Sequence, residues 1–328
     1  MSLVSIVMPV HNAAAWLPRS VSSVIGQSYK DWELVAVDDG SSDASLSVLK
    51  HYASMEPRVR VLSHDCNTGA GAARNTALAV CRGQYVSFLD ADDELPIKSI
   101  EWLLQAAEES TCPLVTARYD WRRISSQKPI DQGSGHLQQE YFRSSQHLQS
   151  IPGSHCCNLY AMSLITVNNL SYPDDLAIGE DQVWQVNALL AAERIAVLDR
   201  IVYIYHHYND ASLTRGAVSV SRTLDDIEHQ RRIAHSLQSN GLRGVALARL
   251  EAWSYSIKEY WHQLPHEHSL PDVLPVFKAM RDLADEFNVL PWNEHTPTEH
   301  KQLLSHILNK EDEVSWQLLT ELSNNQSI

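Results

Sequence analysis

The first third of the chain alternates short apolar runs with amphipathic segments. Apolar runs that predict strands cover residues 4–10, 33–37, 58–62 and 85–89, and helical patterns follow them at 16–27, 43–55, 71–80 and 97–110. This alternation predicts an α/β fold in which a mostly parallel, Rossmann-like sheet is covered by helices on both faces. Ligands of such sheets bind beyond the carboxyl ends of the strands, so the residues directly after each run are candidates for a site.

The rest of the chain has a different pattern. Residues 118–155 lose the periodicity and gather Gln, Ser, Gly and Arg, which predicts a long functional loop or a small insertion. From about residue 219 the pattern is helical, with prolines between the expected helices. We therefore expect two domains, an α/β domain over residues 1–215 and an all-helical domain over residues 216–328.

The composition narrows the class of protein. The 328 residues include 40 acidic and 26 basic ones, and the net charge of −14 argues against binding to nucleic acid or docking on an anionic membrane. Five cysteines without metal-ligand spacing, and a start without a signal-peptide pattern, predict a reduced, cytoplasmic protein. Since no apolar run reaches the roughly 18 residues of a membrane-spanning helix, any contact with the inner face of the membrane is expected to be peripheral.

Two acidic residues, Asp90 and Asp92, directly follow the apolar run at 85–89. Alternation along a strand would aim both carboxylates to the same side, where they repel each other unless a cation joins them. Carboxylate oxygens suit Mg²⁺ or Mn²⁺, particularly when a substrate adds phosphate oxygens. The pair by itself is a weak signal, because acidic turns after strands are common.

Four segments give a stronger signal through their order and spacing: VSIVMPVHN at 4–12, ELVAVDDGSSD at 33–43, NTGAGAARN at 67–75 and YVSFLDADD at 85–93. Together they resemble the inverting glycosyltransferases of family 2, which have the GT-A fold, and the resemblance covers about residues 2–215. It implies metal-dependent transfer of a sugar from a nucleotide diphosphate sugar to a hydroxyl of a glycan or lipid-linked acceptor, as in polysaccharide or lipopolysaccharide biosynthesis at the cell surface.

The resemblance assigns donor-binding roles to residues after the first three strands. Pro9 and His11 belong to the turn that borders the nucleotide, although tyrosine is usual where His11 stands. Asp39 is expected to accept a hydrogen bond from the base, which favours uridine, and its structural alternative is a turn residue. Arg74 matches a diphosphate, and Gly71 is expected to let the backbone approach that group closely. A structural salt bridge is the alternative for Arg74.

The metal site is expected to use Asp92 as a direct ligand, with Asp90 as its partner at the ribose or through water. The segment at 203–214 resembles the one that closes the diphosphate site of the family, but His206 or His207 stands where arginine is common. Adjacent residues of a strand face opposite sides, so only one of these histidines can reach the site, and we expect His207 to do so as a metal ligand or neutral donor. Ser212 is expected to contact the phosphates through its hydroxyl.

A second acidic pair, Glu180 and Asp181, precedes an amphipathic helix at 182–192. By resemblance Asp181 is the general base that removes the proton of the acceptor hydroxyl, with Glu180 supporting it. The structural alternative is capping of the helix. Trp184 is either an acceptor platform or, as we favour, a core residue, and Cys156 and Cys157 are expected in a buried strand.

Two other functions stay open from the sequence alone. A phosphohydrolase could use the same pair of aspartates, but it would normally carry a hydroxyl residue where Glu94 stands. A non-catalytic nucleotide-sugar-binding or scaffold protein is suggested by His11 and by the missing arginine near residue 207. Tryptophans on the C-terminal helices also suggest a homodimer.

Overall fold

We describe the protein from a computed structural model, which covers residues 2–123, 134–141, 155–207, 219–256, 264, 268–288 and 298–325. The chain divides into two compact units, Met1–Asn209 and Asp210–Ile328. The sequence pattern places this boundary a few residues later, between 215 and 216. Each unit is described by itself below.

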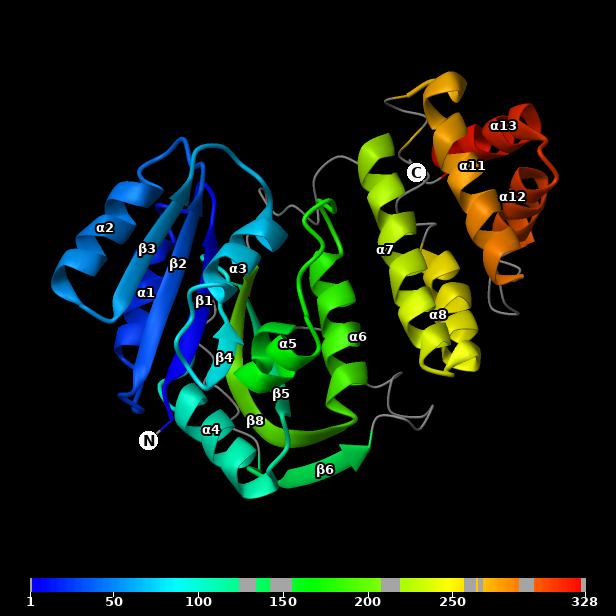
Figure 1. The fold of residues 1–328 in the computed structure, drawn as a ribbon. Helices are drawn as coiled ribbons and strands as arrows, with labels where there is room; N and C mark the ends of the chain where they lie inside the picture. Colours follow the sequence, from blue (N-terminus) through cyan, green and yellow to red (C-terminus); the bar gives the residue numbers. More distant parts are fainter. Residues whose placement is uncertain are drawn as a thin grey trace. The chain divides into compact units, whose positions relative to one another are not determined.

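The first unit begins with the predicted alternation of strands and helices (Figure 1). Its elements are β1 (Val4–Val10), α1 (Leu17–Ile25), β2 (Trp32–Asp39), α2 (Ser45–Met55), β3 (Val59–His64), α3 (Ala70–Leu78), β4 (Tyr85–Phe88) and α4 (Ser99–Ser110). The predicted alternation of strands and helices is confirmed here. It could be recognised in the sequence because the apolar runs of these strands are uninterrupted. Strands β1 and β2 are buried along almost their whole length, as expected of central parallel strands.

The second half of this unit is harder to predict. It contains β5 (Leu114–Arg123), β6 (Leu137–Tyr141), the short 3₁₀ helix η1 (His155–Cys157), β7 (Asn158–Ala161), α5 (Met162–Val167), α6 (Glu180–Ala192) and β8 (Arg194–His207). The segment that the sequence suggests as a loop therefore includes the end of β5 and all of β6. Charged residues such as Arg118, Asp120 and Arg122 on every second position of β5 conceal the strand. Cys156 and Cys157 lie in η1 rather than in the expected strand.

The strands form one mixed sheet in the order β3-β2-β1-β4-β7-β5-β8-β6. Strand β1 pairs in parallel with both β2 and β4, and β5 pairs in parallel with β8, whereas β7 and β6 are antiparallel to their neighbours. The chain moves outward from β1 to β3 and then returns to the other side of β1 with β4. The strand order therefore reverses between β1 and β4, and sheets of this kind bind ligands beyond the carboxyl ends of the strands at such a point.

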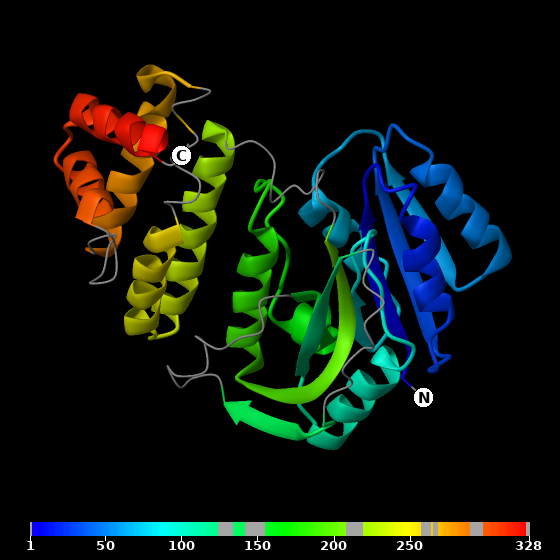
Figure 2. The same cartoon turned by 180° about the vertical axis from the view of Figure 1, so that it is seen from behind.

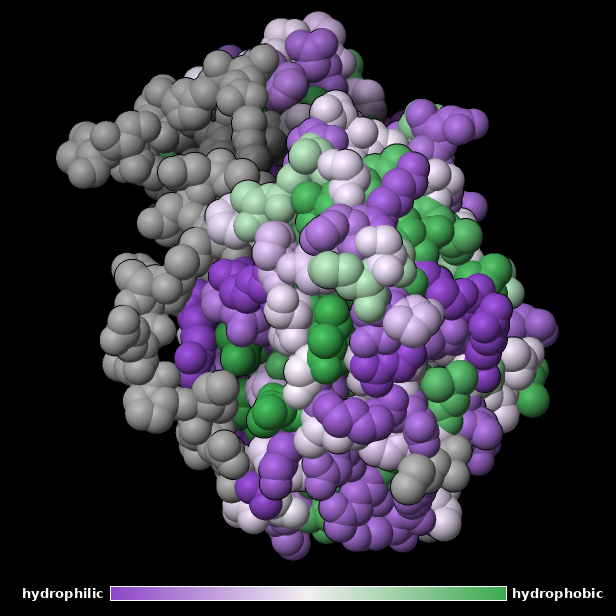
Figure 3. Space-filling model, turned by 90° about the vertical axis from the view of Figure 1, so that its left-hand side faces the viewer, coloured by the Kyte–Doolittle hydropathy of each residue, from purple (hydrophilic) through white to green (hydrophobic). Residues whose placement is uncertain are grey.

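Helices cover both faces of the central strands. Figure 1 shows α3 in front of β1 and β2, and Figure 2, from behind, shows α1 on their other side. The buried face of α1 consists of Leu17, Ser20, Val21 and Val24, which follow helical spacing. Strand β3 is one of the two edge strands, and it is only partly buried. Figure 3 views the side with α2 and β3, where hydrophilic residues predominate.

The second unit is all-helical among the residues that the structure describes. Its helices are α7 (Val220–Ser239), α8 (Arg243–Ser256), α11 (Leu270–Phe287), α12 (Thr298–Leu308) and α13 (Asp312–Asn325). Helix α11 packs on α7 and α12, α7 packs on α8, and α12 packs on α13. In the described part of the chain, no helix has both the length and the apolar character needed to cross a membrane.

A buried carboxylate links the strands at the amino-terminal end of the sheet. Glu33 accepts hydrogen bonds from the Ser5 hydroxyl (2.7 Å), the Arg82 backbone N–H (2.6 Å) and the Arg60 guanidinium (2.8 Å). Burial raises the pKa of Glu33, but the hydrogen bonds and the Arg60 charge outweigh it, so the pKa is lowered overall. The ionised side chain therefore stabilises the folded state.

We predict that Glu33→Gln lowers the free energy of unfolding of the first unit by about 1–3 kcal/mol at pH 7, because an amide cannot accept all three hydrogen bonds. A group with a lowered pKa contributes its stability above its ordinary value of 4.5 and loses it as the pH falls further. The difference between variant and wild type should therefore shrink in acid. Urea denaturation at pH 7 and pH 4 measures it, with the exposed Glu109→Gln as control; an equal difference at both pH values would contradict this role.

Candidate functional site

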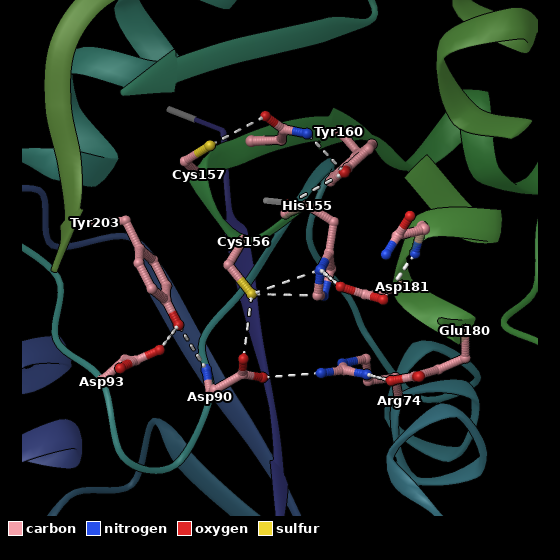
Figure 4. A network of polar contacts seen from close by, with 12 residues as sticks. Arg74, Asp90, Asp93, His155, Cys156, Cys157, Tyr160, Glu180, Asp181 and Tyr203 are labelled. Atoms are coloured by element: carbon pink, nitrogen blue, oxygen red, sulfur yellow. Dashed lines mark hydrogen bonds and ion pairs between the residues drawn. The ribbon is translucent and has the colours of Figure 1, made fainter. Parts of the chain in front are cut away.

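Arg74 joins two segments that lie far apart in the sequence. It projects from α3, its side chain is only 5% exposed, and it packs over the ring of Tyr172 at 5.2 Å. Its Nη2 donates to Asp90 Oδ1 (2.9 Å) and its Nη1 donates to Glu180 Oε1 (2.8 Å), as Figure 4 shows. The planar guanidinium thus holds the end of β4 beside the start of α6.

Asp90 is the centre of this network. Burial raises its pKa, but the Arg74 cation outweighs that effect and the pKa is lowered. The Cys156 thiol donates to Asp90 Oδ2 at 3.7 Å, and the Asp90 backbone N–H donates to the Tyr203 hydroxyl at 3.2 Å. Asp90 is therefore ionised and held from three sides, by α3, η1 and β8.

The next two acids carry the opposite shift. Burial and the Asp90 charge raise the pKa of Asp92 to about 6 and that of Asp93 to about 8. Asp93 accepts hydrogen bonds from the Tyr203 hydroxyl (2.6 Å) and the His206 backbone N–H (2.7 Å). We expected strand alternation to bring Asp90 and Asp92 to the same side. Strand β4 instead ends at Phe88, and the acidic residues lie in a turn in which Asp93 N–H donates to Asp90 O.

The donor atoms fit a hard divalent cation. Asp90 and Asp92 supply carboxylate oxygens and are partly exposed. The pKa of Asp92 is raised by burial first and then by the Asp90 charge, which a cation would offset. Among the described residues, no group of three or more His, Cys, Asp or Glu side chains is arranged to hold a metal. A cation here would therefore need further oxygens from a ligand, as Mg²⁺ commonly takes them from phosphates.

Asp181 lies in the first turn of α6, directly after Glu180. Burial and the neighbouring Glu180 charge raise its pKa to about 6, while Arg74 acts in the opposite direction. Its side chain is 37% exposed, so it can reach a ligand from the solvent side. A partly exposed carboxylate with a pKa near neutrality has the properties of a general base.

His155 is a site residue that the sequence analysis missed. It is 3% exposed, its Nδ1 lies 3.7 Å from Asp181 Oδ2, and its ring packs against Phe88 and Tyr172. Burial lowers its pKa to about 3, so the imidazole is neutral at neutral pH. A single histidine in an aperiodic segment carries no signal in the sequence that could have identified it.

A second polar group lies at the ends of β1 and β2. His11 is exposed, and its Nδ1 donates to the backbone oxygen of Asp39 at 2.8 Å. The Asp39 carboxylate is buried and accepts from the His64 ring (2.7 Å), the Thr68 N–H (2.9 Å) and the Gly69 N–H (2.8 Å). Asp39 therefore anchors the loop that leads into α3, and its contact with a base stays a prediction.

The structure thus brings some of the expected residues together and leaves others apart. Arg74, Asp90, Glu180 and Asp181 form one connected network, and Asp92 lies beside it. Pro9, in β1, and His11 and Asp39 belong to the neighbouring group at the ends of β1 and β2. Arg74 makes the salt bridges that were its structural alternative.

The closing segment is only partly described. His206 Nε2 donates to Glu94 Oε1 at 2.8 Å, so its imidazole faces that side chain. His207 ends β8, but its side chain and all of Ser212 lie outside the described part, so their roles stay predictions. Trp184 is 1% exposed and stacks on Tyr172 with 4.3 Å between ring centroids, which confirms that it is a core residue.

Gly71 allows α3 to approach the segment before α6. A Cβ on Gly71 would lie 2.5 Å from the backbone oxygen of Pro173, which is too close for any side chain. Next to it, the Asn75 amide donates to Tyr172 O and accepts from Tyr172 N–H, both at 2.9 Å. This close contact sets the distance that Arg74 spans, so the glycine serves packing between two segments of the site.

Comparisons with known proteins find one family model and several glycosyltransferases that are similar to this chain. Residues 5–166 match the model of "Glycosyl transferase family 2". Over 316 residues the chain is 27% identical to the "Uncharacterized glycosyltransferase EpsJ" of Bacillus subtilis, covering 92% of this chain and 89% of that protein. It is also 28% identical over 211 residues to a poly(ribitol-phosphate) beta-glucosyltransferase of Bacillus spizizenii, covering 62% of this chain and 32% of that protein.

A solved structure shares the fold. The crystal structure of S. aureus TarS 1-349 in complex with UDP superimposes with a TM-score of 0.74 and 20% identity, covering 100% of this chain and 92% of that one. The same protein has been solved in complex with UDP-GlcNAc. The match confirms the expected GT-A fold, a mostly parallel sheet with helices followed by a helical region.

We predict that Gly71→Ala destabilises the first unit by about 1–3 kcal/mol, because the added methyl group forces α3 away from Pro173. Chemical denaturation followed by tryptophan fluorescence measures the change. Ala72→Ser, one position along the same helix and half-buried, is the matched control and should stay close to wild type. A Gly71→Ala variant as stable as that control would contradict the packing role.

Proposed function

Through residues 5–166 this chain belongs to glycosyl transferase family 2, and we propose that it transfers one sugar from a uridine diphosphate sugar to a hydroxyl group of a glycan or lipid-linked acceptor. The transfer is of hexosyl or N-acetylhexosaminyl type and inverts the anomeric centre. We place the reaction in the biosynthesis of a cell-surface polysaccharide and the protein in the cytoplasm. A homodimer and peripheral contact with the membrane stay predictions.

One observation carries this proposal. The Arg74 guanidinium holds Asp90, at the end of β4, and Glu180, at the start of α6, within hydrogen-bonding distance of itself. Asp90 and Asp92 supply the acidic group that suits a cation and a diphosphate, while Asp181 supplies a base. A transferase needs both groups next to each other, because the leaving phosphate and the attacking hydroxyl meet at one carbon atom.

The chemistry follows from this arrangement. The Asp181 carboxylate takes the proton of the acceptor hydroxyl while the oxygen forms a bond to the anomeric carbon of the donor. The bond from that carbon to the diphosphate breaks on the opposite face, and the electron pair leaves with the nucleoside diphosphate. A resident Mn²⁺ or Mg²⁺ on Asp92 and Asp90 would offset the charge of this leaving group.

The nucleotide assignment has two supports. Asp39 and His11 lie at the ends of β2 and β1, on one side of β4, where a base would extend from a diphosphate at Asp90. TarS, which shares the fold, has been solved with UDP and with UDP-GlcNAc. For an imide such as uracil to reach the Asp39 carboxylate, one of its present donors in the loop 67–69 would have to give way.

The family match also bears on the enzyme classes left open by the sequence. It favours a transferase over a phosphohydrolase, because the match includes both the pair at 90–92 and the preceding segments. A binding protein without turnover is the alternative that experiment must exclude.

The direct test is donor binding and turnover by variants of the two acidic groups. Calorimetry with UDP and MnCl₂ should show binding that Asp92→Asn abolishes, because the cation loses a direct ligand. Asp181→Asn should bind UDP normally but lower the rate of sugar transfer by about 10²-fold or more, as expected when a general base is lost. Asp31→Asn, directly before β2 and therefore at the opposite end of the strands, is the control. Failure of wild type to bind any nucleoside diphosphate with metal would refute the proposal, and binding without turnover would favour a binding protein.

We predict that activity falls on the acid side of the pKa of Asp181, because the protonated carboxyl group cannot accept a proton. With that pKa at about 6, kcat/KM should decrease about tenfold per pH unit below pH 6. Arg74→Gln should move this limb to higher pH, since it removes the cation that lowers the pKa of Asp181. Arg58→Gln, which removes a distant guanidinium paired with Glu56, should leave it in place. An unmoved limb in Arg74→Gln would argue that another group is the base.

A further inference from the structure

Four aromatic side chains form a stripe on β5 and β8. Tyr119 and Trp121 lie two residues apart on β5, directly opposite Tyr203 and Tyr205 on β8. Residues two apart on a strand share a face, so the four side chains lie on the same side of the sheet. The ring centroids of Trp121 and Tyr205 are 4.7 Å apart, and those of Tyr119 and Trp121 are 6.3 Å apart.

One end of this stripe is part of the candidate site. Tyr203 is 1% exposed, and its hydroxyl donates to Asp93 and accepts the backbone N–H of Asp90. A pair of backbone hydrogen bonds between Glu94 and Ile204 fixes residues 90–94, called here the acidic loop, against β8. Burial first, and then the charges of Asp93, Asp90 and Asp92, raise the pKa of Tyr205 to about 12, which places its ring within the field of these acids.

The other end of the stripe is exposed to solvent. Trp121 is 58% exposed, although tryptophan is a large apolar residue. The other large hydrophobic side chains exposed in the described structure include Met55, Ile97 and Val167, which are aliphatic and lie on other elements. An exposed tryptophan beside a tyrosine ring, adjoining an active-site loop, is typical of a ligand contact rather than of packing.

We propose that the face of Trp121, supported by Tyr205, binds a sugar ring of the acceptor. This inference rests on the proposed function. Aromatic faces pack against the C–H groups of a pyranose, while tyrosine hydroxyls can bond to its hydroxyl groups. The aromatic stripe would then lead the acceptor chain toward the acidic loop.

The order of the strands favours the acceptor over the donor as the occupant. His11 and Asp39, the groups proposed for the nucleotide, lie at the carboxyl ends of β1 and β2, which are on one side of β4. Trp121 and Tyr205 lie on β5 and β8, on the other side of β4. Five steps separate β2 from β8 in the sheet, which is about 24 Å at the usual strand spacing. A nucleotide that occupies the first side with its diphosphate at Asp90 leaves the aromatic side for the acceptor.

The test begins with binding and needs no turnover. The protein is labelled with 5-fluorotryptophan, and the ¹⁹F signal of Trp121 is identified by its absence from the Trp121→Phe spectrum. Maltotriose, chitotriose and β-1,4-galactotriose are then titrated in the presence of UDP and MnCl₂. At least one trisaccharide should shift the Trp121 signal. A signal unmoved by all three, or one that UDP alone moves to the same extent, would overturn the inference.

Kinetics with the trisaccharide that binds provides the second arm. Trp121→Ala should raise the KM for this acceptor about tenfold, as for loss of an aromatic anchor, and should leave the Kd for UDP unchanged, which shows that the variant is folded. Trp121→Phe should restore most of the affinity, and Met55→Ala, at the end of α2, is the matched exposed control. A KM unchanged in Trp121→Ala would refute the platform. Absence of any UDP release from UDP-glucose or UDP-GlcNAc by wild type would instead refute the proposed function, while the ¹⁹F result would still decide the inference.

Discussion

The site depends on burying one guanidinium. A charged group removed from water is tolerated only when partners of opposite charge compensate it, and Arg74 has two, Asp90 and Glu180. These partners come from the end of β4 and the start of α6, so satisfying the cation requires both segments to be in place. The acidic loop and Asp181 are therefore positioned by an electrostatic requirement of the fold itself.

The negative charges of the other two acids, Asp92 and Asp93, are not compensated by the Arg74 guanidinium. The pKa of Asp90 is lowered, whereas those of Asp92 and Asp93 are raised, although all three lie within one turn. The difference arises because Arg74 reaches only the first of them. Such a difference in pKa suits a site in which the remaining negative charge is neutralised only when a cation binds together with its ligand.

Much of the fold and part of the candidate site could be predicted from the sequence, and the rest could not for physical reasons. Uninterrupted apolar runs define β1, β2 and β4, and polar residues follow their carboxyl ends, so the fold and the position of Asp90 were predictable. Asp181 was located by the family resemblance of the acidic pair at the start of α6. Charged residues on alternate positions hid β5, including Trp121. The role of Gly71 was also out of reach, because its neighbour Pro173 lies about 100 residues away in the sequence and only the folded chain brings them into contact.

The paired hydrogen bonds between Asn75 and the backbone of Tyr172 substitute for a strand partner. A side-chain amide here does what a neighbouring β-strand would do, since it satisfies both the N–H and the C=O of one residue. The chain is thus fixed at Tyr172 by Asn75 and again at Glu180 by Arg74, which are neighbours on α3. In mechanical terms, an amide and a guanidinium from consecutive positions of one helix clamp the segment before Asp181 at two points, so a shift of α3 would carry Asp181 with it.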